Sequence, residues 1–209
     1  SEGMLRISNT EIYRNTTRGS GGGIYNLAGG LTITGSAIYD NQASSGGAIY
    51  LASEDFVRSA SVNVTNSTIS GNEASFGPGI FVSRGTRLSL NFVTIANQKG
   101  KGGIYTEEGA SVNVKNSIVG NNLVDCDGVV SAIVASGNNF DTDGTCPGFT
   151  QVTSTDLNLG ALQLNPPGTT RTHALLPGNV AIDAVTDCTD VRGVTIGSDQ
   201  RGVSRPQGP

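Results

Sequence analysis

One pattern constrains the fold of this chain more than any other: a short apolar alternation recurs along its first 114 residues. In each copy two aliphatic residues flank one polar residue, and the copies begin at residues 5, 31, 62, 88 and 112, at intervals of 26, 31, 26 and 24 residues. Such recurrence is typical of a repeat protein, in which equivalent positions of successive units stack on one another. The copies are Leu5-Arg6-Ile7, Leu31-Thr32-Ile33, Val62-Asn63-Val64, Leu88-Ser89-Leu90 and Val112-Asn113-Val114.

Two more positions keep a fixed offset in all five units. A β-branched residue follows the second aliphatic residue by five positions, at Ile12, Ile38, Ile69, Ile95 and Val119. Three positions later comes an amide, at Asn15, Asn41, Asn72, Gln98 and Asn122. Asn tolerates the left-handed backbone of a sharp turn, and stacked amides can bond along a column. We therefore expect the amides to form a structural ladder.

Each unit offers three short segments of period-two alternation separated by turn residues, and no window has the spacing of an amphipathic helix. Three strands per unit of 24–31 residues predict an all-β solenoid, the right-handed parallel β-helix, with about five or more coils in residues 1–122. Residues 123–209 interrupt the repeat, and we expect them to form the last coil or coils and an irregular C-terminal capping region of the same domain. In that region Asp199 is expected to pair with Arg201 or Arg205.

Composition agrees with this architecture and excludes several others. The 30 glycines among 209 residues show no three-residue period, which excludes collagen. The 13 Lys and Arg against 17 Asp and Glu give a net charge of −4, which argues against a nucleic-acid partner. No apolar run approaches about 18 residues, so no transmembrane segment is predicted. The chain begins at Ser1 rather than Met, and we expect a processed or excised segment.

Three cysteines lie in the C-terminal part of the chain. They lack the paired spacing of a zinc site, and the single histidine, His173, stands alone and is expected to be structural. Cys126 and Cys146 flank a polar loop, which favours a disulfide that would stabilise the fold by about 3 kcal/mol. Three unpaired thiols are the alternative, and Cys188 has no predicted partner in either case.

The repeats and the tail resemble a known group of bacterial surface proteins. The segment Asn66-Ser67-Thr68-Ile69-Ser70-Gly71-Asn72 and the Gly-Gly-Ile-Tyr units are similar to the repeats of polymorphic-outer-membrane-protein-like β-helix proteins, of the pectate-lyase-like superfamily. The tail resembles the C-terminal region of secreted β-helix proteins in which a surface-anchor module follows. This resemblance implies a right-handed parallel β-helix, a secreted or cell-surface location and an anchor beyond Pro209. The matching tail segments are 137–146, 172–178, 181–184 and 199–206.

The sequence predicts no catalytic residue, metal or cofactor. A β-helix hydrolase needs two carboxylates on one face, and a lyase needs a Ca²⁺-binding carboxylate cluster and a base. The acidic residues of the repeats do not share a column, and Glu54-Asp55 lies on an insertion. Asp141, Asp143 and Gly144 form only part of a Ca²⁺ loop.

The most suggestive surface feature is aromatic. Tyr25, Tyr50, Phe81 and Tyr105 each follow a bore-facing residue, so they should point outward in a stacked row that binds a ligand or serves only mutual stacking. We predict a non-catalytic extracellular or cell-surface segment that acts in adhesion, surface display or assembly. Its expected partners are cell-surface glycans or another protein chain, including a second copy bound end to end. The alternatives are a polysaccharide-binding or polysaccharide-degrading β-helix and a fibre-like or tail-spike-like oligomer.

Overall fold

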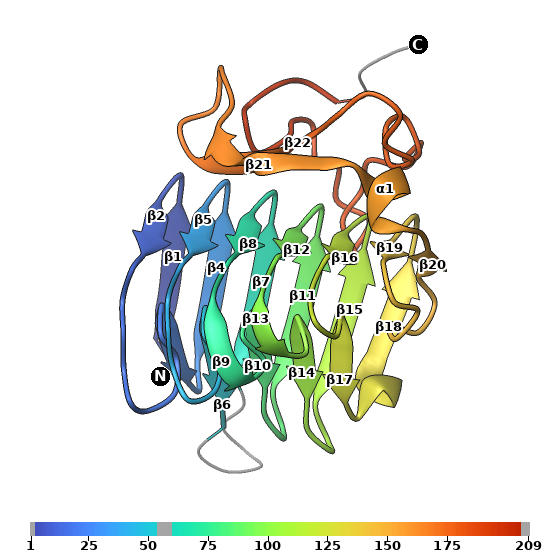
Figure 1. The fold of residues 1–209 in the computed structure, drawn as a ribbon. Coiled ribbons are helices and arrows are strands. Elements are labelled where there is room, and N and C mark those ends of the chain that lie inside the picture. Colours follow the sequence, from blue (N-terminus) through green and yellow to red (C-terminus); the bar gives the residue numbers. More distant parts are fainter. Residues whose placement is uncertain (1–2, 54–59, 206–209) are drawn as a thin grey trace.

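The computed structural model describes residues 3–53 and 60–205, and the chain forms a right-handed parallel β-helix (Figure 1). This confirms the predicted fold class. Successive strands wind around one axis, and each strand pairs in parallel with the equivalent strand of the next coil. The predicted insertion with Glu54-Asp55 falls on residues 54–59, outside the described residues.

Three parallel sheets form the sides of the rod. Sheet 1 contains β1 (Met4–Ser8), β4 (Gly30–Thr34), β7 (Ser61–Thr65), β11 (Arg87–Asn91), β15 (Ser111–Lys115) and β18 (Ile133–Ser136). Sheet 2 contains β2 (Glu11–Tyr13), β5 (Ala37–Tyr39), β8 (Thr68–Ser70), β12 (Thr94–Ala96), β16 (Ile118–Gly120), β19 (Phe140–Asp141) and β20 (Thr150–Gln151). Sheet 3 contains β3 (Ile24–Leu27), β6 (Ile49–Ala52), β10 (Ile80–Val82), β14 (Ile104–Thr106) and β17 (Cys126–Gly128). A further pair, β9 (Glu73–Phe76) and β13 (Lys99–Lys101), widens one corner.

The repeat positions lie opposite one another in adjacent coils. Leu31 pairs with both Leu5 and Val62 in sheet 1, and Ile38 pairs with Ile69 in sheet 2. From the second coil onward these aliphatic side chains are almost completely buried in the bore. Burial of each side chain contributes roughly 1.5–3 kcal/mol, so the bore supplies most of the driving force for folding.

The amides at the corner after sheet 2 form the ladder that their spacing predicts. The backbone N–H and Nδ2 of Asn41 both donate to Oδ1 of Asn72, each at 3.0 Å. Nδ2 of Asn72 donates back to the carbonyl of Ile38 in the preceding coil, also at 3.0 Å. Gln98 and Asn122 continue the pattern. Each internal amide therefore links three coils.

A glycine beneath the ladder lets the chain approach closely. A Cβ atom on Gly103 would lie 2.8 Å from Nδ2 of Asn122 and 3.0 Å from the carbonyl oxygen of Asp125. Any larger residue would push the ladder amide away from its partners. This explains why a glycine precedes the third strand of that unit.

The tail completes a last coil and then runs back along the side of the rod (Figure 1). After the 3₁₀ turn η1 (Val130–Ala132) and the short helix α1 (Ser154–Leu157), β21 (Leu159–Leu164) and β22 (Arg171–Leu175) form an antiparallel hairpin over sheet 2. The hairpin covers the outer face of sheet 2, which explains why β5 and β8 are buried along their whole length. Among the described residues, none of the helices is both long and apolar enough to cross a membrane.

Replacing Asn72 by Leu should strongly destabilise the protein. The change leaves two donors of Asn41 and the carbonyl of Ile38 unpaired in the interior, and one such group costs about 1–3 kcal/mol. We expect the free energy of unfolding in urea to fall by about 3 kcal/mol or more. The matched change Asn15→Leu, at the exposed end of the ladder, should cost about 1 kcal/mol or less. Equal losses at the two positions would contradict the ladder.

Candidate functional site

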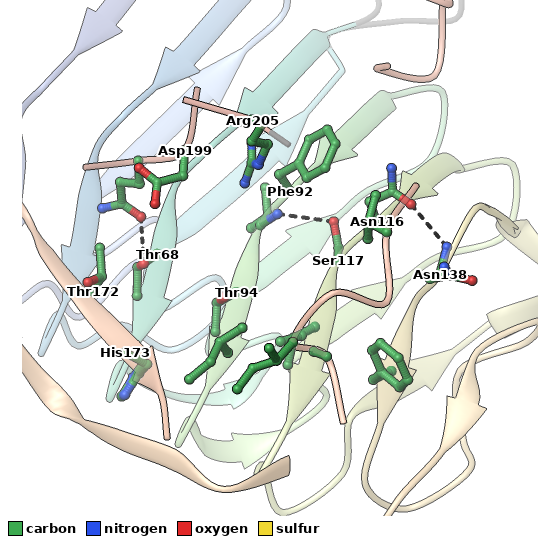
Figure 2. A pocket seen from close by; sticks show the side chains of 18 of the residues that line it. Thr68, Phe92, Thr94, Asn116, Ser117, Asn138, Thr172, His173, Asp199 and Arg205 are labelled. Atoms are coloured by element: carbon green, nitrogen blue, oxygen red, sulfur yellow. Dashed lines mark hydrogen bonds between the residues drawn. The ribbon is translucent and has the colours of Figure 1, made fainter. Parts of the chain in front are cut away.

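A cavity of about 790 Å³ lies between sheet 2 and the C-terminal part of the chain (Figure 2). Sheet 2 contributes Thr94 of β12, Ile118 of β16 and Phe140 of β19. The hairpin contributes Leu175, and Ile182 comes from the segment that follows. The cavity lies within the size range of small-molecule sites and has a mixed aliphatic and polar lining.

Residues 184–205, which we call the C-terminal strap, form the other side of the cavity and are held by asparagines. These lie at or beside the corner between sheets 1 and 2. The side chains of Asn66, Asn116 and Asn138 donate to strap carbonyls, and Oδ1 of Asn91 accepts from the backbone N–H of Val191 at 2.8 Å. Because each asparagine belongs to a different coil, the strap runs from the last coil back toward the first. The strap acceptors are the carbonyls of Ser198, Asp187 and Ala184, respectively.

The strap contains a motif that we did not recognise as a repeat in the sequence. Asp-x-Arg-Gly-Val occurs at residues 190–194 and again at 199–203. In both copies Oδ1 of the aspartate accepts from the backbone N–H groups of the arginine and the valine, and Oδ2 accepts from the arginine side chain. Asp199 thus pairs with Arg201, one of its two expected partners, at 2.7 Å. The nine-residue spacing was the signal that could have revealed the motif.

The hairpin is docked on sheet 2 by buried polar contacts. Arg171 forms an ion pair with Glu11 and donates to the hydroxyl of Tyr39. Burial, together with the hydrogen bond that Tyr39 donates to Glu11, raises the pKa of Tyr39 to about 12. His173 lies 2.9 Å from the hydroxyl of Ser70 through Nε2 and 2.7 Å from the carbonyl of Gly160 through Nδ1. Nδ1 therefore carries the proton and Nε2 accepts from the serine.

The contact between His173 and Ser70 resembles a base and a nucleophile, but burial argues for a docking role. Ser70 is 3% exposed, and it is not among the residues that line the cavity. A substrate in the cavity would not reach the Ser70 hydroxyl. Burial lowers the pKa of His173, so the ring is neutral near pH 7.

Phe92 and Arg205 form a second contact between the rod and the strap. The guanidinium carbon of Arg205 lies 4.0 Å from the centre of the Phe92 ring. Phe92 has a left-handed backbone with φ of 54°, an uncommon conformation for a bulky residue. Its neighbours in the same corner column are Asn66 and Asn116, with φ of 47° and 52°. Both residues of the contact line the cavity.

The predicted aromatic row stacks along sheet 3. Tyr25, Tyr50, Phe81 and Tyr105 have successive ring centroids 5.4, 4.7 and 4.9 Å apart, with nearly parallel planes. Phe81 is only 6% exposed, because its neighbours close both of its faces. A sugar ring needs an open aromatic face, so the inner rings of the row are poorly placed to bind one.

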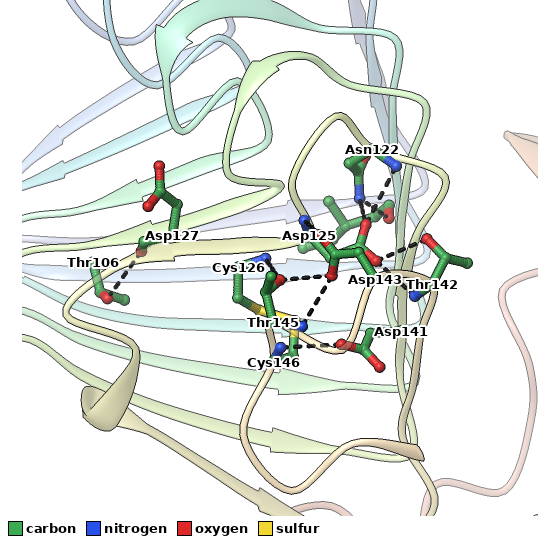
Figure 3. Close-up of a disulfide and its surroundings, with 11 residues drawn as sticks. Thr106, Asn122, Asp125, Cys126, Asp127, Asp141, Thr142, Asp143, Thr145 and Cys146 are labelled. Atoms are coloured by element: carbon green, nitrogen blue, oxygen red, sulfur yellow. Dashed lines mark hydrogen bonds between the residues drawn. A yellow bond between two sulfur atoms is a disulfide. The ribbon is translucent and has the colours of Figure 1, made fainter. Parts of the chain in front are cut away.

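Cys126 and Cys146 are joined in a disulfide, the pairing expected from the sequence (Figure 3). Cys126 occupies the bore column of sheet 3, directly opposite Ile104, and both cysteines belong to the buried core. The disulfide therefore holds the last coil against the end of the aliphatic core. Cys188 is a free thiol of the strap and lines the cavity.

Three aspartates lie beside this disulfide. Asp125, Asp141 and Asp143 each place one carboxylate oxygen within 4.8 Å of the others (Figure 3). Burial raises the pKa of Asp125 and of Asp141. Burial acts in the same direction on Asp143, but hydrogen bonds, first of all from Thr145, outweigh it and lower the pKa of this carboxyl.

Protein donors already occupy most of these carboxylate oxygens. Both oxygens of Asp125 and of Asp143 and one oxygen of Asp141 accept hydrogen bonds, whereas Oδ1 of Asp141 has no hydrogen-bond partner among the described residues. Asp125 accepts from Asn122 and so ends the amide ladder, because a carboxylate accepts but cannot donate. A cation at this cluster would have to compete with these donors for the carboxylate oxygens.

Comparison with known families places this architecture. Residues 1–123 match the family model described as a right-handed β-helix region, and the chain belongs to this family. The searches of curated proteins and of solved structures give no significant match.

The docking of His173 should make stability depend on pH. Its pKa in the folded state is below the ordinary value of 6.5, so the unfolded chain takes up the proton first as the pH falls. The free energy of unfolding should therefore decrease as the pH falls from about 7.5 through 6.5. His173→Asn leaves the chain without histidine and should reduce this dependence in urea titrations at pH 7.5 and 5.5. Parallel pH profiles for the two proteins would contradict the assignment.

Proposed function

We propose that this chain is a non-catalytic adhesive segment of a secreted or cell-surface β-helix protein, and that it binds a glycan in the cavity beneath the C-terminal strap. The observation that carries the proposal is the cavity itself, about 790 Å³ in volume and bounded on one side by a regular sheet. Its lining alternates hydroxyl groups, such as that of Thr94, with aliphatic and aromatic groups, such as Ile118 and Phe140. A sugar presents both hydroxyl groups and apolar C–H faces, so it suits such a lining.

The carboxylates of the cavity favour binding over hydrolysis. Two carboxylates, Asp183 and Asp199, are among its lining residues. Both oxygens of Asp199 are occupied by Arg201 and by backbone donors. Hydrolysis by the usual mechanism needs one free carboxylate and a second one that can transfer a proton. Of these two carboxylates, Asp183 is the one that can accept a hydrogen bond from a ligand hydroxyl.

The rod gives this site a fixed position on an elongated support. The strap is attached to the corners of four successive coils, and so it is held to the rod along its length. Such a geometry supports a role in adhesion or surface display. The row of stacked rings in sheet 3 serves mainly to stabilise the coils.

Filling the cavity should abolish binding. We expect the protein to bind members of a glycan array and to release no products from uronic-acid polymers, with or without Ca²⁺. Thr94→Trp projects a large side chain into the cavity and should reduce binding at least about 10-fold. The matched variant Thr32→Trp, on a strand of sheet 1 outside the cavity, should bind like the unchanged protein.

Thermal unfolding of both variants is the control for folding. Equal binding by the Thr94→Trp variant would place the ligand elsewhere on the rod. Release of sugar products would show that the protein is an enzyme and would contradict the proposed non-catalytic role. End-to-end association without glycan binding would favour a fibre-like role instead.

A further inference from the structure

Within the residues that the structure describes, Arg205 differs from the other arginines of the C-terminal region because it has no carboxylate partner. Arg171, Arg192 and Arg201 each form an ion pair with a carboxylate. Among the residues that the structure describes, Arg205 bonds only to neutral oxygens, donating through Nη1 to Oδ1 of Asn66 at 2.6 Å and to the carbonyl of Ser198 at 2.9 Å. No carboxylate of the described residues therefore forms an ion pair with its charge.

Arg205 is partly shielded from water and lines the cavity. The side chain is half-buried and lies against the ring of Phe92 in the wall of the cavity. The acidic side chain whose field acts most strongly on Arg205 is Asp199, which already forms an ion pair with Arg201. Burial lowers the pKa of Arg205, but an arginine remains protonated at neutral pH. The Coulomb attraction between this cation and a nearby anion is stronger where the side chain is partly shielded from water than on an exposed surface.

The guanidinium retains donors for such an anion. Nε and Nη2 make no hydrogen bond within the described part of the chain, and neither is among its buried unpaired atoms. A guanidinium fork matches the two oxygens of a carboxylate or of a sulfate group. The ring of Phe92 lies against the guanidinium, with its centre 4.0 Å from the guanidinium carbon.

We infer that Arg205 is the anion-binding residue of the cavity and that the glycan is acidic, with a carboxylate or sulfate group on the sugar held against the Arg205–Phe92 pair. This inference rests on the proposed function, since it concerns the same cavity. Thr94 lies two residues from Phe92, and its hydroxyl makes no hydrogen bond to any residue that the structure describes, so a sugar ring next to the anion would meet a polar group there.

The test compares charged and neutral forms of one sugar. Glucuronate, glucose 6-sulfate and glucose are titrated into the intact chain, and binding is followed by NMR on the arginine Nε–H and threonine methyl signals. We expect at least one of the two anions to bind about 10-fold more tightly than glucose and to shift the Nε–H signal of Arg205. A difference of that size corresponds to about 1.4 kcal/mol. The two anions distinguish a carboxylate from a sulfate.

Variants assign the preference to one side chain. Arg205→Gln should bring binding of the anion down to the level of glucose, and Arg205→Lys should retain part of the preference because it keeps the charge. Arg192→Gln, at the paired arginine of the other Asp-x-Arg-Gly-Val copy and outside the lining of the cavity, should retain the preference. If Arg205→Gln proves unstable, the Nε–H signal of Arg205 in the unchanged protein still shows whether the anion binds at this side chain.

Each outcome separates this inference from the proposed function. Equal binding of glucose and both anions, blocked by Thr94→Trp, would overturn the inference and leave the glycan site in place. A preference that survives in Arg205→Gln would also overturn it. If none of the three sugars moves the cavity signals, or if an acidic peptide moves them instead, both proposals fall.

Discussion

The whole structure depends on the in-register hydrogen bonding of parallel strands between adjacent coils. Because Leu31 lies opposite Leu5 on one side and Val62 on the other, every sequence position of a unit becomes a column along the rod. A column repeats one environment many times, so a residue that suits one coil suits its neighbours as well. Aliphatic side chains fill the bore for this reason, and the amides gain partners above and below.

The columns also prepare the surface on which the tail binds. A left-handed corner recurs between sheets 1 and 2, and asparagine is the side chain that best tolerates this backbone. The same residue carries an amide that points away from the rod and bonds to any backbone group within reach. The strap uses this property through its main chain, and side chains such as Asp187, which pairs with Lys115, and Gln200, which bonds to Thr68, add further attachments. An irregular segment can thereby lie against a regular rod.

This difference explains how much of the molecule could be predicted from its sequence. The coils, their columns and the amide ladder follow from offsets that recur within 31 residues or fewer, and a repeat displays them directly. The strap contacts join residues such as Asn66 and Ser198, which are 132 positions apart and share no pattern. The acceptors on the strap are backbone carbonyls, which every residue has, so the sequence does not reveal which of them bind the rod. The cavity therefore could not be predicted, although the disulfide that closes the last coil could.

Asp125 and Cys126 show a second reason for partial prediction. They follow Asn122 after an irregular step, so the offset that identified the other columns fails there. The structure nevertheless returns Cys126 to the isoleucine column and ends the ladder on Asp125. The columns impose the same physical requirements even where the sequence spacing changes. An apolar side chain must still fill the end of the bore, and the last ladder amide, Asn122, still needs an acceptor.

Phe92 links the regular and the irregular part of the molecule. Asparagine would fit its left-handed corner at lower cost, and the conformation disfavours a phenylalanine by about 1–3 kcal/mol. The contact with Arg205 recovers about 0.5–2 kcal/mol, which offsets much of that strain. The rod therefore gains little from Phe92 by itself, and the residue is favourable only where the strap is in place. Strain on the rod and an unpaired charge on the strap meet at one point of the cavity wall, and a bound anion would stabilise that contact without requiring any change in the coils beneath it.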